Sequence, residues 1–347
     1  MPETLNSSPD SSTPALPTSR PPLTHVPLSS TPLPELDLTA GPWPGERRRV
    51  GDLTLHVRHT ERLTDGADET RIRSASAVYV HGLGGSATNW TDLGRLLAPH
   101  AAGHAPDLPG FGLSEPRDGF SFSLSSHAEV LAGYLDEHTE APVHLLGNSM
   151  GGAVAMLVAA RRPELVRTLT LISPAVPDRR PDPRRLAEPR LPLAYLPVIG
   201  KRVRRTLAAM TPRERAEQVL RLCFADPASV PDRRFDEFVE EHGARAAHVW
   251  AQRAMALSTL EIFRTWFARG DESLWSVAPR ISAPTLVVWG THDRVISVRR
   301  APRTARLIPC ARLFVLPRTG HVAQMERPTT VAKAVLGMWE SVEEGRW

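Results

Sequence analysis

A serine between two glycines separates an apolar run from a helical pattern, and no other feature constrains the fold as strongly. Residues 143–146 predict a buried strand, and residues 150–161 predict a helix that Pro163 ends. The junction, Gly147-Asn148-Ser149-Met150-Gly151, fits G-x-S-x-G. In this setting the glycines leave room for a sharp turn that lifts the serine hydroxyl above a sheet. The junction predicts a nucleophile, Ser149; the alternative is a serine that only caps the helix.

Apolar runs and helical patterns alternate on both sides of this junction. Residues 47–50 and 53–59 predict an antiparallel hairpin at the edge of the sheet. The alternation predicts an α/β fold with a doubly wound, mostly parallel sheet. The further strands are expected at 77–80, 104–108, 143–146, 168–172, 285–289 and 313–316, and the helices at 89–98, 124–138, 150–161 and 331–344.

The alternation stops after the sixth strand, near Pro174. Residues 175–270 are first rich in arginine and proline and then helical, at 216–223, 233–242 and 245–265, without a strand between them. We therefore expect a core made of residues 46–174 and 271–347, with a helical cap inserted at 175–270. Residues 1–45 are rich in proline, serine and threonine, and we expect a disordered tail there.

Composition excludes several classes of function. The net charge is only +4, and no basic stripe interleaved with aromatic residues indicates nucleic-acid binding. Two cysteines, Cys223 and Cys310, give no disulfide framework and no cysteine zinc site, which favours a cytoplasmic location. No run of about 18 apolar residues predicts stable membrane insertion, and no secretory signal is recognisable. We expect no cofactor and no metal.

A serine nucleophile needs a base and an acid that orients it. Asp293 follows the strand at 285–289, and His321 follows the strand at 313–316. Both belong to loops at the carboxyl ends of parallel strands, where open α/β sheets place their sites. The order Ser149, Asp293, His321 is the order of α/β-hydrolase triads.

Two backbone amides are candidates for an oxyanion hole. Met150 begins the helix after the nucleophile, and Leu83 lies in the glycine-rich run His81-Gly82-Leu83-Gly84-Gly85. We interpret His81 as a residue that orders this loop. Asp107 is interpreted as the anchor of the turn that follows it. Five other histidines are expected on the surface: His56, His59, His100, His242 and His248.

These motifs together resemble the α/β-hydrolase fold superfamily, in its branch with a helical cap, over residues 46–345. The resemblance implies a serine hydrolase in which Ser149 attacks, His321 is the base, Asp293 orients it, and the Leu83 and Met150 amides bind the oxyanion. A serine at the nucleophile position argues against dehalogenases and epoxide hydrolases, which carry an aspartate there. The motifs are His81-Gly82-x-Gly84-Gly85, Asp107-Leu108-Pro109-Gly110-Phe111-Gly112-x-Ser114, Gly147-Asn148-Ser149-Met150-Gly151-Gly152, Gly290-x-x-Asp293 and Gly320-His321.

The substrate is less constrained. The run from Asn148 to Gly152 is similar both to esterases and lipases and to hydrolases that cleave a carbon–carbon bond of meta-cleavage dienone acids. The second group typically has a tryptophan after its histidine, where this chain has Val322, and its oxyanion loop also differs from the run after His81. We therefore expect a small carboxylic ester, with a short or medium acyl chain or an aromatic group.

Three alternatives stay open beside the ester hydrolase. They are the carbon–carbon hydrolase, a cofactor-free enzyme of the haloperoxidase kind, and a non-catalytic receptor or scaffold with the same fold. The partner expected is a small molecule, and the oligomeric state is not predicted.

Overall fold

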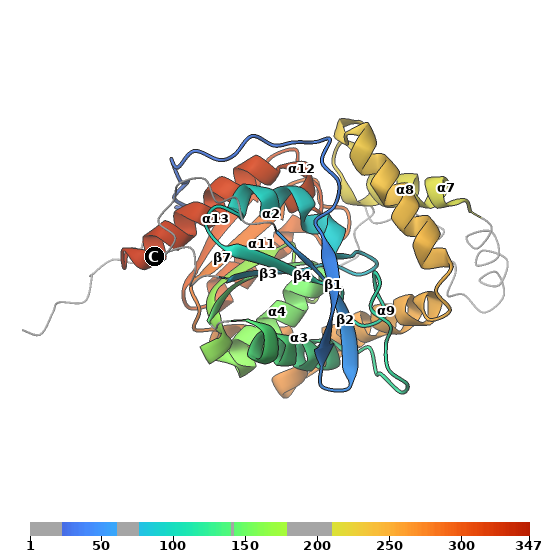
Figure 1. The fold of residues 1–347 in the computed structure, drawn as a ribbon. Coiled ribbons are helices and arrows are strands. Elements are labelled where there is room, and N and C mark those ends of the chain that lie inside the picture. The colour runs from blue at the N-terminus through green and yellow to red at the C-terminus, as the bar shows by residue number, and fades with distance from the viewer. Residues whose placement is uncertain (1–22, 61–75, 140–141, 179–209) are drawn as a thin grey trace, which may run out of the picture.

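The strands form one sheet in the computed structural model, which describes residues 23–60, 76–139, 142–178 and 210–347 (Figure 1). The order across the sheet is β1-β2-β4-β3-β5-β6-β7-β8. β2 pairs antiparallel with both β1 and β4, and all the pairs from β4 across to β8 are parallel. This confirms the predicted α/β fold. The strands are β1 (Gly45–Val50), β2 (Leu53–His59), β3 (Ser76–Val80), β4 (Ala102–Pro106), β5 (Val143–Asn148), β6 (Val166–Ile172), β7 (Thr285–Gly290) and β8 (Ala311–Leu316).

Helices cover both faces of the sheet, and side chains alternate between them. Val78 and Val80 of β3 join the core under α3 and α4, whereas Ala77 and Tyr79 join the core under α2 and α13. Central strands are therefore apolar on both faces, as parallel sheets require. The helices are α2 (Thr91–Leu97), α3 (Leu124–His138), α4 (Met150–Arg161), α7 (Pro212–Cys223), α8 (Asp232–Ala246), α9 (Ala251–Phe267), α10 (Leu274–Val277), α11 (Ala301–Leu307), α12 (Ala323–Glu326) and α13 (Pro328–Glu343).

None of the helices in the described ranges has the length and apolar character needed to cross a bilayer.

The expectation of a disordered tail is wrong for residues 23–44, which we call the N-terminal strap. The strap runs over α13 and α2 as an extended segment (blue in Figure 1). The amide of Ser29 donates to the Lys333 carbonyl at 2.9 Å, and its hydroxyl donates to Glu340 at 2.5 Å. Apolar side chains of the strap also pack on the core: Val26, Leu33, Leu36 and Trp43. Residues 1–22 lie outside the described residues.

The chain between β6 and β7 is helical where it is described. It contains α7, α8 and α9, with α10 following before β7. The predicted helix at 245–265 is interrupted, because α8 continues to Ala246 and α9 begins only at Ala251. Between them the rings of His248 and Trp250 stack with their centroids 4.6 Å apart. The first part of the expected insertion, residues 179–209, lies outside the described residues.

Candidate active site

Ser149 occupies the turn between β5 and α4 in a strained backbone conformation. Its φ is 55° and its ψ is −117°, a region that residues with a Cβ rarely adopt. Three backbone hydrogen bonds hold it there. The Ser149 amide donates to Ile172 at 3.0 Å, and its carbonyl accepts from Ala153 at 3.1 Å and Ala175 at 2.8 Å. Such strain costs about 1–3 kcal/mol and is typical of functional sites.

Two glycines let the backbone segments meet closely around this turn. A Cβ at Gly151 would lie 2.2 Å from the Val80 carbonyl oxygen, at the end of β3. A Cβ at Gly147 would lie 2.5 Å from the Gly151 carbonyl oxygen. The beginning of α4 therefore packs directly on the ends of β3 and β5, which fixes the position of Ser149.

Asp293 and His321 form a buried pair. Nδ1 of His321 and Oδ2 of Asp293 are 2.9 Å apart, and the side chains are at most 5% exposed. The other carboxylate oxygen accepts from the amides of Val295 at 2.8 Å and Ile296 at 2.9 Å. The carboxylate therefore binds the Nδ1–H tautomer of the ring and leaves Nε2 able to accept a proton.

Asn148 connects this pair to the serine turn. Its side-chain amide donates to the carbonyl of Ile172 at 3.0 Å and to that of His321 at 3.1 Å. The residue before Ser149 thus ties the end of β5 to the backbone of His321. Among the described residues, no hydrogen bond joins the Ser149 hydroxyl to the His321 ring; such contacts are often long without a substrate. Sequence reasoning missed the bridging role of Asn148, although a polar side chain at the end of a buried strand was a signal for it.

The two predicted oxyanion donors flank Ser149. Met150 is buried at the first position of α4, and partly buried Leu83 follows β3. The loop of Leu83 passes close to the serine, since a Cβ at Gly82 would lie 3.1 Å from that of Ser149. Within the described part of the chain, neither the Leu83 nor the Met150 amide donates to another backbone carbonyl. A helix N-terminus adds a favourable field for negative charge here.

His81 orders its loop, as predicted. The Leu108 amide donates to Nε2 at 2.9 Å, so Nδ1 carries the proton and donates to the Gly82 carbonyl at 2.8 Å. Complete burial lowers the pKa of His81, which keeps the ring neutral. With both nitrogens occupied, this ring supports the loop of Leu83 and takes no part in proton transfer.

Asp107 anchors its turn, which was also predicted. Its carboxylate contacts Nδ1 of His56 at 2.8 Å and accepts from the amides of Ala87 at 2.7 Å and Leu113 at 3.0 Å. Burial opposes ionisation of Asp107, but these hydrogen bonds leave its pKa below the usual value. His56 is therefore buried, and the expectation that it lies on the surface is wrong; His242 is buried as well, while His59, His100 and His248 are half-buried.

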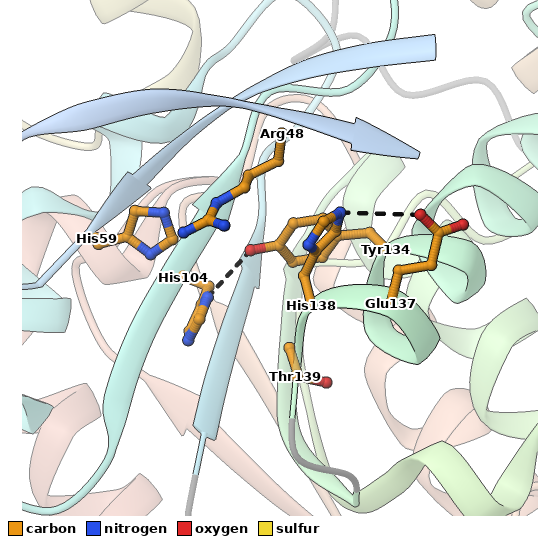
Figure 2. A pocket seen from close by; sticks show the side chains of 7 residues that line it. All are labelled: Arg48, His59, His104, Tyr134, Glu137, His138 and Thr139. Carbon is orange, nitrogen blue, oxygen red and sulfur yellow. Dashed lines mark hydrogen bonds and ion pairs between the residues drawn. The ribbon is translucent and has the colours of Figure 1, made fainter. Parts of the chain in front are cut away.

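A cavity of about 340 Å³ lies away from these residues, between the β1–β2 hairpin, β4 and the end of α3 (Figure 2). Nδ1 of His104 and the Tyr134 hydroxyl are 3.0 Å apart in it. Burial lowers the pKa of His104 to about 4. The cavity is lined by Arg48, His59, His104, Tyr134, Glu137, His138 and Thr139, and by none of the predicted catalytic residues.

Across the described ranges no group of three or more His, Cys, Asp or Glu side chains is arranged to hold a metal ion.

Comparisons with known proteins agree with this architecture. The family model for the alpha/beta hydrolase fold matches residues 78–328. A 2-hydroxy-6-oxononadienedioate/2-hydroxy-6-oxononatrienedioate hydrolase of Cupriavidus pinatubonensis is 29% identical, over 79% of this chain and 92% of its own. A monoacylglycerol lipase of Bos taurus is 26% identical, over 85% of each chain.

Among solved structures, 2-hydroxy-6-oxo-6-phenylhexa-2,4-dienoate hydrolase of Rhodococcus sp. strain RHA1 superposes with a TM-score of 0.66. The two sequences are 24% identical, and the match covers 86% of this chain and 98% of that one. This chain therefore belongs to the alpha/beta hydrolase fold family, and it is a hydrolase.

Proposed function

We propose that the protein is a serine hydrolase of small carboxylic esters. The single observation that carries this proposal is the strained Ser149 turn tied, through Asn148, to the backbone of a histidine that is hydrogen-bonded to a buried aspartate. A strained serine beside an oriented imidazole is the arrangement that nucleophilic acyl transfer needs.

In the proposed reaction, the Ser149 oxygen attacks the ester carbonyl carbon while Nε2 of His321 accepts the hydroxyl proton. The oxyanion that forms accepts hydrogen bonds from the Leu83 and Met150 amides. His321 then gives its proton to the leaving alcohol, which leaves an acyl group on Ser149. A water molecule, deprotonated by His321, attacks this acyl group, and the acid leaves as Ser149 regains its proton.

We further propose that the helical insertion is a cap over this site. Met255 of α9 supports this, because a Cβ at Gly84 would lie 2.6 Å from its methyl carbon. Gly84 follows Leu83, so an apolar side chain of the insertion lies beside one proposed oxyanion donor. An apolar wall there suits an acyl chain or an aromatic ring, which agrees with the substrate expected from the sequence.

Cleavage of a carbon–carbon bond is the second candidate, because several relatives are named as hydrolases of dienone acids. The lipase relatives favour the ester. Val322 favours it as well, because the carbon–carbon hydrolases typically have a tryptophan at this position. Val322 is 8% exposed and packs against Leu220 and Phe224 of the insertion, so this position is filled by a small apolar side chain.

We also propose a cytoplasmic location, since Cys223 and Cys310 are free thiols.

A fluorophosphonate probe with peptide mapping tests the mechanism, and we expect the label on Ser149. p-Nitrophenyl esters from acetate to laurate and a dienone acid, compared on one preparation, test the substrate. Faster turnover of short or medium esters is expected, with a broad profile, because an apolar pocket discriminates by only about 1–3 kcal/mol per methylene. A higher rate on the dienone acid than on every ester would reverse the ranking, and labelling of another residue would exclude the mechanism.

A further inference from the structure

The turn that ends α7 touches the loop of the proposed catalytic base. We call residues 221–226 the α7 turn. The amide of His321 donates to the Cys223 carbonyl at 2.6 Å. A Cβ at Gly320 would lie 2.2 Å from the same carbonyl oxygen, so the two backbones are in direct contact. The insertion therefore supplies a hydrogen-bond acceptor to the backbone of the base.

The same turn is also bound by the loop of the proposed acid. Arg294, which follows Asp293, donates through Nη1 to the carbonyl of Arg221 at 2.6 Å and to that of Phe224 at 3.1 Å. These carbonyls belong to the end of α7, where unpaired carbonyls and the helix dipole favour a cation. The α7 turn is thus held from both sides of the Asp293–His321 pair.

Glu326 joins these parts with one carboxylate. Its Oε2 accepts from the amide of Gly320 at 2.6 Å, directly before His321. Its Oε1 accepts from the amides of Ala225 at 3.1 Å and Asp226 at 3.3 Å, in the α7 turn. Hydrogen bonds to an ionised acceptor are about twice as strong as neutral ones. One side chain therefore bridges the insertion and the loop of the base.

Apolar packing surrounds this bridge. Phe224 and Leu220 of the insertion pack with Val322, the residue after His321, and Met325 contacts the same cluster. Because packed clusters of this kind resist small displacements, the loop of His321 and the α7 turn are expected to move as one unit.

We propose that Glu326 is a positioning residue, which holds His321 in register with Ser149 by fixing its loop to the insertion. This inference rests on the proposed function, because it assigns the task of Glu326 through His321. The two oxygens of the carboxylate accept from backbone amides on two sides, and no uncharged side chain of similar shape can do so. In Glu326→Gln, the amide nitrogen must face a backbone N–H on one side, so one half of the bridge opens.

Loss of register affects the chemical step more than substrate binding. A displacement of about 1 Å at a reacting group can lower a rate about 100-fold. For Glu326→Gln we expect kcat on a short p-nitrophenyl ester to fall about 10- to 100-fold, with KM changed less than about twofold. The rate constant for fluorophosphonate labelling of Ser149 should fall by a similar factor.

Glu214→Gln is the matched control. Glu214 lies in the first turn of α7, at the opposite end of that helix from the α7 turn, and its Oε2 accepts from the Thr211 amide at 2.7 Å. This control replaces a carboxylate that accepts from a backbone amide of the insertion, without touching either catalytic loop, so its kcat and labelling rate should equal those of the wild type. Arg294→Gln is the second variant, and it keeps the test available if Glu326→Gln does not fold. It opens the acid side of the α7 turn and should also lower kcat at constant KM.

All rates are expressed per labelled Ser149, so that a smaller folded fraction does not mimic slower chemistry. Wild-type rates in both Glu326→Gln and Arg294→Gln would overturn the positioning role while leaving the proposed function intact. Equal losses in Glu214→Gln would overturn it as well, since they would indicate a general disturbance of the insertion. A wild-type protein with neither labelling nor ester turnover would remove the proposed function, and the inference with it.

Discussion

Trp43 attaches the N-terminal strap to the body of the protein, and its removal gives a measurable loss of stability. The side chain is 3% exposed, and its Nε1 donates to the Thr91 carbonyl at 3.0 Å. Its ring meets that of Tyr79 edge-on, with centroids 5.8 Å apart. Gly94 leaves the space for it, because a Cβ there would lie 2.0 Å from the indole. Trp43→Ala therefore leaves a cavity against α2 and removes the hydrogen bond to the Thr91 carbonyl.

The magnitude follows from that burial. Replacing a buried tryptophan by alanine costs about 3–5 kcal/mol. With an unfolding entropy of about 2.1 cal/mol/K per residue, a chain of 347 residues loses about 4–7 °C of Tm for this change. Calorimetric scans at one scan rate measure it. Leu38→Ala, in the same strap but 39% exposed, is the control and should shift Tm by less than about 1 °C. A Trp43→Ala protein that melts with the wild type would refute the view that the strap stabilises the fold.

Three further predictions concern the site and its surroundings. Asp293→Asn should keep the fold and lower kcat by about 10⁴, as in protease triads, because the wrong tautomer of His321 is then favoured; steady-state kinetics with thermal melts check this. Gly151→Ala should lower Tm and slow labelling of Ser149, because its Cβ would lie 2.2 Å from the Val80 carbonyl oxygen; an unchanged Tm would contradict it. Burial lowers the pKa of His104 to about 4, so the unfolded chain binds the proton before the folded protein does. The free energy of unfolding should therefore fall as the pH drops from about 6.5 to about 4, by at most roughly 3 kcal/mol. Urea titrations at about pH 7.5 and about pH 4.5 check this: the free energy of unfolding should differ less between the two pH values for His104→Gln than for the wild type.

The sheet and its main helices could be predicted from the sequence, because local signals set them. The helices expected at 124–138 and 150–161 have the observed bounds of α3 and α4. Ser123 caps the first of them by accepting from the Ser126 amide, and the nucleophile turn precedes the second. The order of Ser149, Asp293 and His321 along the chain also followed from the motifs.

The strap could not be predicted, because its partners are distant in the sequence and its composition is typical of disorder. Ser29 is separated from Glu340 by 311 positions, and nothing near Ser29 indicates that contact. The short helices α10, α11 and α12 were missed for a related reason: segments of four to seven residues carry too little periodicity to be recognised.

The link between the insertion and His321 was missed because of its chemistry. The Cys223 carbonyl and the Gly320 amide are backbone groups that any residue could supply, so no pattern of side chains indicates them. The burial of His56 was missed for another reason: its partner is the side chain of Asp107, which lies after another strand and 51 positions away in the sequence.

The two outer strands of the sheet bear on the solubility of the protein. An unpaired strand edge invites pairing with another molecule, and natural proteins block such edges with charge or with their own chain. The β1 edge carries three exposed arginines, Arg47, Arg48 and Arg49, which repel a second copy. The β8 edge is occupied instead by the beginning of the strap, since the Leu313 amide donates to the Leu23 carbonyl at 2.8 Å. A chain shortened beyond residue 23 would expose this edge, and its tendency to aggregate through intermolecular β-pairing should rise.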